Sequence, residues 1–184
     1  MHKEEIISEY AKKIKKVLIT EEEIRTEIQK AGKYIDQIYD GRPILLVSIL
    51  KGAFIFMADL CRAVKVPCQI EFMRVKSYYQ GTESSGKVKI TMDLDRDIKD
   101  CHVVIVEDIV DTGRTLNDVV KILKEREPAS IKVVTLLDKP SRRVVDFKAD
   151  MSLFTIPDYF VIGYGLDCDE EYRSLPYIAE YGAE

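Results

Sequence analysis

Short apolar runs of strand length alternate along this chain with segments whose apolar residues recur at helical spacing. Residues 44–50, 103–106 and 131–137 are mostly apolar runs, which is typical of strands buried on both faces. Residues 54–64 and 115–126 lie between these runs and have helical periodicity. Because parallel strands need a crossover connection that a helix usually supplies, the alternation predicts an α/β fold, with a mainly parallel central sheet flanked by helices.

A further helix is predicted ahead of these strands. Thr20 followed by Glu23 forms a capping box, and residues 24–38 then carry apolar side chains at helical spacing until Asp40 and Gly41 end the run.

A polar stretch near the middle of the chain separates two strand-like segments. Residues 69–75 precede it, and residues 88–92 follow it with apolar and polar residues in alternation, as in a half-exposed strand. We therefore predict a two-stranded β-ribbon whose connection, residues 76–87, is a mobile loop. Residues 159–164 are predicted to form the last strand of the core.

Length and composition limit the class of protein. With 184 residues, of which 46% are hydrophobic, the chain can bury one substantial core, so we predict a single domain over residues 1–184. A formal net charge of -4 gives no general attraction to nucleic acid or to an anionic membrane. The apolar runs are shorter than a membrane span and the N-terminus is charged, which predicts a cytoplasmic protein.

The cysteines and histidines do not indicate a metal or nucleophilic site. Two histidines, His2 and His102, give a histidine-based mechanism little to build on, so general base catalysis falls to a carboxylate. Irregular spacing predicts reduced, mostly buried thiols at Cys61, Cys68, Cys101 and Cys168.

The segment 103–116, VVIVEDIVDTGRTL, has the order of a phosphate-binding turn. An apolar strand ends in two acids, Glu107 and Asp108, and a short turn leads into a helix that begins at Thr115. Backbone N–H groups at a helix start converge on an anion, and threonine hydroxyls add donors without charge. The acids can accept bonds from sugar hydroxyls. The predicted binding residues are Glu107, Asp108, Asp111, Thr112, Gly113, Arg114 and Thr115.

This run resembles the signature of the type I phosphoribosyltransferases, which use 5-phosphoribosyl pyrophosphate, and more narrowly that of the bacterial hypoxanthine phosphoribosyltransferases. Further landmarks of that family follow in the expected order at residues 50–52, 76–78, 137–140, 157–161 and 163–167. The resemblance implies the type I phosphoribosyltransferase fold, with a small hood formed by the N- and C-terminal segments, and a homodimer or homotetramer.

The resemblance also implies roles for individual residues. Asp111 is expected to take the proton from N7 of the base, and two Mg²⁺ ions are expected at Glu107, Asp108 and Asp167. Family members bind pyrophosphate at a turn with a non-proline cis peptide, here preceding Lys51 and Gly52, together with Arg173. Ser77 and Tyr78 are expected on the loop that closes over the reaction. The base is expected to contact Lys139, Phe160, Val161 and Asp167, with Lys139 favouring 6-oxopurines over adenine.

Each position alone has a simpler structural explanation. Glu107 and Asp108 can end a strand and Thr115 can cap a helix. Gly52 can join a strand to a helix beside an exposed Lys51, residues 76–87 can be a solvated connection, and Phe160 can be a core aromatic. Asp167 and Arg173 can be surface charges. The order of the motifs favours the functional interpretation.

Two other motifs carry little weight. Residues 81–88 match a P-loop except that Val88 stands where Ser or Thr should hold magnesium, and the alternating segment after it predicts a strand where a P-loop needs a helix. Gly163 and Gly165 form a lone GxG. The segment after Tyr177 lacks the apolar strand expected there in relatives.

The function predicted is purine salvage: transfer of the phosphoribosyl group to hypoxanthine, and to guanine, giving IMP or GMP and pyrophosphate. One alternative is a regulator that keeps the fold and binds nucleic acid, which the acidic charge balance disfavours. The other is the same reaction with xanthine preferred.

Overall fold

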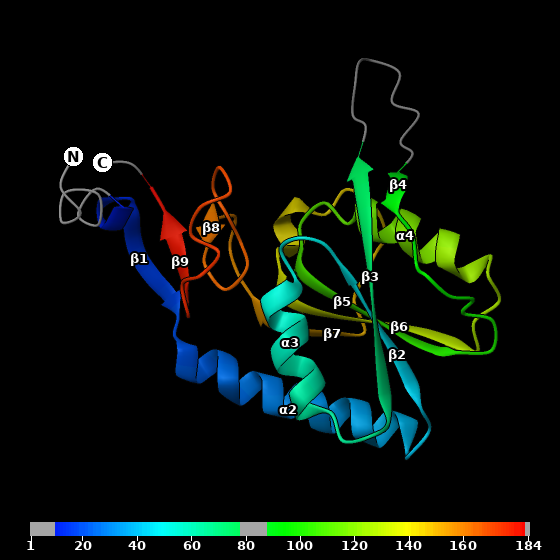
Figure 1. The fold of residues 1–184 in the computed structure, drawn as a ribbon. Coiled ribbons are helices and arrows are strands. Elements are labelled where there is room, and N and C mark those ends of the chain that lie inside the picture. Colours follow the sequence, from blue (N-terminus) through cyan, green and yellow to red (C-terminus); the bar gives the residue numbers. More distant parts are fainter. Residues whose placement is uncertain (1–9, 78–87, 183–184) are drawn as a thin grey trace.

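A six-stranded sheet forms the centre of the molecule in the computed structural model, which describes residues 10–77 and 88–182 (Figure 1). Its strand order is β4-β3-β2-β5-β6-β7, and all neighbours are parallel except β3 and β4. The strands are β2 Ile44–Ile49, β3 Cys68–Ser77, β4 Val88–Met92, β5 His102–Val110, β6 Ser130–Asp138 and β7 Met151–Thr155. The predicted mainly parallel sheet is confirmed.

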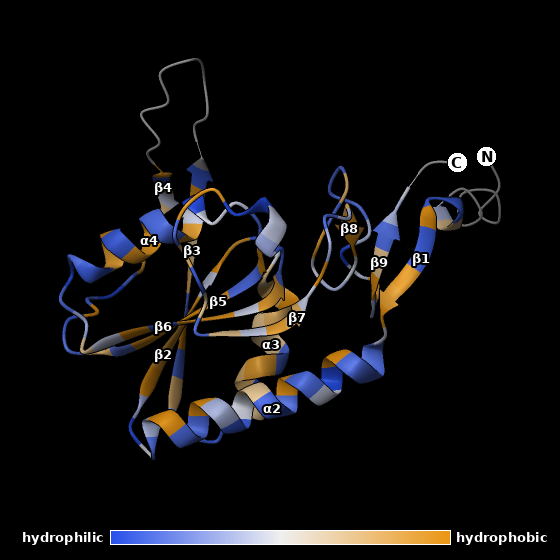
Figure 2. Cartoon of the chain, turned by 180° about the vertical axis from the view of Figure 1, so that it is seen from behind, coloured by the Kyte–Doolittle hydropathy of each residue, from blue (hydrophilic) through white to orange (hydrophobic). Residues whose placement is uncertain are grey.

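Helices cover both faces of this sheet. Helices α2 (Glu21–Tyr39) and α3 (Phe54–Ala63) pack on one face, against a core that includes Leu46. Helix α4 (Arg114–Lys124) packs on the other face, against a core that includes Leu45. Successive strand residues point to opposite faces, so a doubly covered strand is apolar throughout. In Figure 2, β2 is largely orange, whereas orange and blue alternate along α2.

Helix α2 begins and ends where the sequence predicts. The Thr20 amide donates to Glu23 Oε2 at 2.8 Å, and the Glu23 amide donates to Thr20 Oγ1 at 3.3 Å, which completes the capping box. Asp40 follows the helix in the left-handed conformation, with φ 46°, and Gly41 follows with φ 80°. A positive φ takes the backbone out of the right-handed helix, and Asp and Gly adopt it more readily than most residues do. These two residues therefore end the helix.

A small antiparallel sheet lies beside the main one and joins distant parts of the chain (Figure 1). Its order is β1-β9-β8, with β1 Ile14–Ile19, β8 Val161–Ile162 and β9 Ile178–Tyr181. The prediction of a core strand at residues 159–164 is wrong, because only two of these residues form a strand and it belongs to this small sheet. The last strand of the main sheet is instead β7, which the mixed composition of its segment concealed.

The C-terminal segment also differs from the prediction. We expected no apolar strand after Tyr177, but Ile178 and Ala179 are fully buried in β9. A strand of four residues is sufficient here because β9 pairs with β1 on one side and with β8 on the other.

Smaller differences concern boundaries and cysteines. Strand β5 does not end at Glu107 and Asp108 but continues to Val110, paired with β6, and α4 begins one residue before Thr115. The four cysteines are free and half-buried, less buried than predicted.

The β3–β4 ribbon is confirmed, and β4 rather than a helix follows the P-loop-like segment. Residues 78–87, most of the predicted mobile loop, lie outside the described residues. None of the described helices is both long and apolar enough to cross a membrane.

Candidate active site

The turn between β5 and α4 ends at a glycine with a positive φ. Strand β5 ends at Val110 and α4 begins at Arg114, so three residues make the turn. Gly113 has φ 81°, and a Cβ there would lie 2.9 Å from Arg143 Cδ. Both its conformation and its contact with the segment behind the turn therefore require glycine.

The peptide groups of the turn face a concave surface. Bonds from outside the turn fix the carbonyl oxygens of Asp111, Thr112 and Gly113, donated by Arg143 Nη1, the Val144 amide and the Asn117 amide respectively. In a trans peptide the following N–H points opposite to the carbonyl, so the amides of Thr112 and Gly113 point away from Arg143 and Val144, whereas the Arg114 amide donates to Thr112 Oγ1 at 3.4 Å. A cavity of about 150 Å³ is lined by residues 107–113, 115 and 116. The turn thus offers room and converging donors, as an anion site requires.

Two acids, Glu107 and Asp108, line the same cavity. Burial, together with the neighbouring Asp108 charge, raises the pKa of Glu107 well above its usual value, and burial raises the pKa of Asp108 to about 6. Glu107 Oε2 is buried without a hydrogen-bond partner. Such carboxyls are stabilised by a ligand that brings hydroxyl donors or a cation.

Glycines bring three distant motifs into contact. A Cβ on Gly52 would lie 1.6 Å from Asp108 Oδ2, and a Cβ on Gly165 would lie 2.0 Å from the Gly52 carbonyl oxygen. The turn at Lys51, which follows a cis Leu50–Lys51 peptide, is therefore packed between the acidic end of β5 and the loop after β8. The cis bond that the family resemblance implies is present.

The two cations expected to bind pyrophosphate share an acidic partner. Lys51 Nζ lies 2.8 Å from Glu170 Oε2, and Arg173 Nη2 lies 3.2 Å from the same oxygen. Arg173 also pairs with Asp167 Oδ1 at 2.9 Å and donates to the Gly165 carbonyl at 2.8 Å. The structure therefore brings together Lys51, Gly52, Asp167 and Arg173, with Glu170 as an additional member.

The residues expected to contact the base form a neighbouring group. Lys139 follows β6, is 7% exposed, and donates from Nζ to the Tyr159 carbonyl. Phe160 is 57% exposed, which contradicts its interpretation as a core aromatic and leaves its ring available for stacking. Val161 is buried in β8.

Sequence reasoning missed Glu170, Arg142 and Asp158. Arg142 pairs with both Asp111 and Asp158. The three missed residues look like ordinary surface charges in the sequence, because their contacts arise only from tertiary structure. Ser77 ends β3, and Tyr78 lies outside the described residues.

The donor atoms of this site suit magnesium that is bound together with substrate. Within the described residues, no group of three acidic, histidine or cysteine side chains could hold a metal ion unaided. Magnesium commonly takes one or two carboxylates and completes its shell with substrate phosphates and water. The buried carboxyls of Glu107 and Asp108, of which Glu107 Oε2 has no hydrogen-bond partner, fit that pattern, and Asp167 fits it separately.

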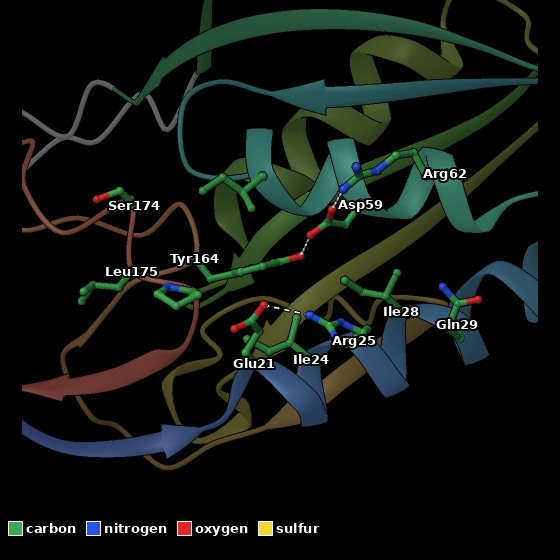
Figure 3. Close-up of a pocket in the computed structure, with 12 residues that line it drawn as sticks. Glu21, Ile24, Arg25, Ile28, Gln29, Asp59, Arg62, Tyr164, Ser174 and Leu175 are labelled. Atoms are coloured by element: carbon green, nitrogen blue, oxygen red, sulfur yellow. Dashed lines mark hydrogen bonds and ion pairs between the residues drawn. The ribbon is translucent and has the colours of Figure 1, made fainter.

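A cavity of about 480 Å³ lies between α2, α3 and residues 174–176. Figure 3 shows the Tyr164 side chain extending across it towards Asp59, and the Tyr164 hydroxyl donates to Asp59 Oδ2. Because Gly165 follows Tyr164, this bond helps to hold the loop that contacts Gly52.

Comparisons with known proteins agree with this geometry. Residues 13–169 match the family model of the phosphoribosyl transferase domain. The chain therefore belongs to the phosphoribosyltransferase family.

Two similar curated proteins within that family are bacterial enzymes. The chain is 50% identical over 165 residues to the hypoxanthine-guanine phosphoribosyltransferase of Streptococcus pneumoniae, covering 90% of this chain and 92% of that protein. It is 49% identical over 166 residues to the hypoxanthine phosphoribosyltransferase of Salmonella typhimurium, covering 89% and 93%. A crystal structure of the Staphylococcus aureus hypoxanthine phosphoribosyltransferase superimposes with a TM-score of 0.89 at 45% identity, covering 92% of each chain.

Proposed function

We propose that this protein transfers the 5-phosphoribosyl group from phosphoribosyl pyrophosphate to hypoxanthine and guanine, releasing pyrophosphate in purine salvage. The observation that carries the proposal is the turn from Asp111 to Thr115. Residues 111–113 and 115 line one cavity together with Glu107 and Asp108, which suits a sugar phosphate: the start of a helix at one end and hydroxyl acceptors at the other.

The reaction is a substitution at the anomeric carbon. The bond from that carbon to the pyrophosphate oxygen breaks, a ring nitrogen of the base bonds to the carbon, and Asp111 accepts the proton from N7. Lys51 and Arg173 stabilise the charge of the leaving pyrophosphate. Lys139 donates to the 6-oxo oxygen, and the exposed face of Phe160 stacks on the purine.

Magnesium is the cofactor we propose, held by Glu107 and Asp108 on the ribose side and by Asp167 on the base side. Bound there together with substrate oxygens, it would supply positive charge that neutralises the pyrophosphate. A cytoplasmic location and a homodimer or homotetramer remain predictions, the latter measurable by light scattering.

The test uses purified protein, magnesium and phosphoribosyl pyrophosphate with hypoxanthine, guanine or xanthine in parallel. Asp111→Asn should lower kcat by about 10²- to 10⁴-fold, because the general base is lost. Asp95→Asn, which changes an exposed acid after β4, is the matched control and should retain full activity. Wild-type protein that releases no nucleotide from any of the three bases would reject the function.

A further inference from the structure

A chain of alternating charges runs from Asp111 to Lys139. Arg142 Nε lies 3.2 Å from Asp111 Oδ1, and Arg142 Nη1 lies 3.6 Å from Asp158 Oδ2. The other oxygen of Asp158, Oδ1, lies 3.6 Å from Lys139 Nζ. The carboxylate proposed to accept the N7 proton is therefore linked to the ammonium proposed to bind the 6-oxo oxygen.

Local backbone structure places the two cations together. Strand β6 ends at Asp138, and Pro140–Arg142 then forms a 3-10 helix in which the Arg142 amide donates to the Lys139 carbonyl at 3.0 Å. Lys139 directly precedes this helix and Arg142 is its last residue, so the two side chains leave the backbone within one turn of each other. Asp158, from the segment between β7 and β8, lies within reach of both.

The neighbouring arginine has a different role. Arg143 pairs with Asp138 and donates to the Asp111 carbonyl, so it fixes the backbone of the phosphate turn. Arg142 contacts the Asp111 side chain instead. Arg143 thus supports the backbone of the turn, while Arg142 orients the Asp111 carboxylate.

The chemistry of the base makes this linkage useful. N7 and the 6-oxo oxygen lie on the same edge of a purine, so the groups that contact them must be held at a matching separation. Lys139 is 7% exposed, and a buried ammonium needs a counter-charge, which Asp158 provides. Adenine carries an amino group in place of the oxygen and cannot accept from Lys139, so discrimination depends on where the ammonium is held.

We propose that Arg142 and Asp158 are positioning residues that set the separation between Asp111 and Lys139 and thereby the preference for 6-oxopurines. The proposal rests on the roles assigned above to Asp111 and Lys139. Side-chain exposures of 48% for Arg142 and 52% for Asp158 make the pair weak as a source of stability. Variants should therefore fold normally, and their effects should appear in recognition and turnover.

Steady-state kinetics on hypoxanthine and adenine test the proposal. Arg142→Gln should lower kcat for hypoxanthine about tenfold, because a misoriented base costs rate without preventing binding. The kcat of Arg142→Lys should lie between those of wild type and Arg142→Gln, since lysine restores the charge but not the planar guanidinium group that reaches two carboxylates. Asp158→Asn should raise the KM for hypoxanthine and reduce the hypoxanthine-to-adenine ratio of kcat/KM about tenfold.

Several readouts separate positioning from a general structural effect. The KM for phosphoribosyl pyrophosphate should stay within about twofold in every variant, since the phosphate turn is braced by Arg143 and not by Arg142. The Arg142→Gln/Asp158→Asn double variant should lose less than the product of the two single effects, as coupled residues do. Arg25→Gln, which removes an exposed arginine paired with Glu21 in α2, is the control and should behave as wild type.

The possible results lead to distinct conclusions. If Arg142→Gln and Asp158→Asn keep the wild-type kcat/KM for hypoxanthine and the wild-type preference over adenine, the inference is wrong while the transferase function stands. It is also wrong if Asp158→Asn raises the KM for phosphoribosyl pyrophosphate as much as the KM for hypoxanthine. Inactive wild-type protein would instead reject the transferase function itself, and the inference with it.

Discussion

Gly165 lies against Gly52, so closely that a Cβ on Gly165 would be 2.0 Å from the Gly52 carbonyl oxygen. Gly165 also has φ 101°, which adds a conformational reason for glycine. The loop after β8 can therefore pack against the turn after β2 only if residue 165 has no side chain.

Gly165→Ala should destabilise the protein and impair binding of phosphoribosyl pyrophosphate. Gly41→Ala is the matched control, because Gly41 has φ 80° and a Cβ added there would have no atom within 4 Å. The control should cost about 1 kcal/mol from the positive φ alone, whereas Gly165→Ala should cost at least about 2 kcal/mol more because of the overlap. Urea unfolding measures the stability of both variants. Equal losses of unfolding free energy in Gly165→Ala and Gly41→Ala would show that the loop moves freely away from Gly52.

The raised pKa of Asp108, about 6 against an ordinary 3.8, predicts an unusual pH dependence of the ligand-free protein. Between these values the folded state binds more protons than the unfolded state, so this group favours folding below about pH 4 and loses that contribution as pH rises through 6. Asp108→Asn should therefore be more stable than wild type at pH 7, by at most about 3 kcal/mol, and equally stable near pH 4. Denaturant unfolding at both pH values tests this, and a variant less stable than wild type at pH 7 would contradict it.

Glu170 pairs with both Lys51 and Arg173, and these hydrogen bonds hold its pKa below the usual value. A pyrophosphate that binds the same cations must compete with this carboxylate. Glu170→Gln should lower the KM for phosphoribosyl pyrophosphate about two- to fivefold at low ionic strength, the range expected for exposed ion pairs. The gain should shrink at high salt, and a raised KM would show that Glu170 assists binding.

Phe160 is 57% exposed, so its removal should affect the base more than the fold. Phe160→Ala should raise the KM for hypoxanthine about tenfold through lost stacking, because aromatic pairs contribute about 0.5 to 1.5 kcal/mol beyond buried area. Its unfolding free energy should change by less than that of Phe72→Ala, which alters a 38% exposed phenylalanine of β3. An unchanged KM would remove Phe160 from the base site.

Most strands of the main sheet and the turn at Asp111 could be predicted because each depends on local sequence. Doubly covered strands such as β2 are mostly apolar, and the order of acids, glycine and threonine around Asp111 is continuous in the chain. The short strands β8 and β9 could not be predicted, since Val161 and Ile178 extend only because they pair with segments far away. Arg142 and Glu170 were missed for a similar reason: their partners are brought close by tertiary structure.

The central place of β9 in the small sheet has a consequence for folding during synthesis. Strand β1 leaves the ribosome first, but its partner β9 is complete only when Tyr181 has been made. The Tyr181 amide donates to the Phe160 carbonyl at 2.8 Å, and their rings meet edge to face at 5.5 Å. The main sheet can therefore form before β9 has been synthesised, whereas β1 and β8 must wait for β9 before they can pair in the small sheet.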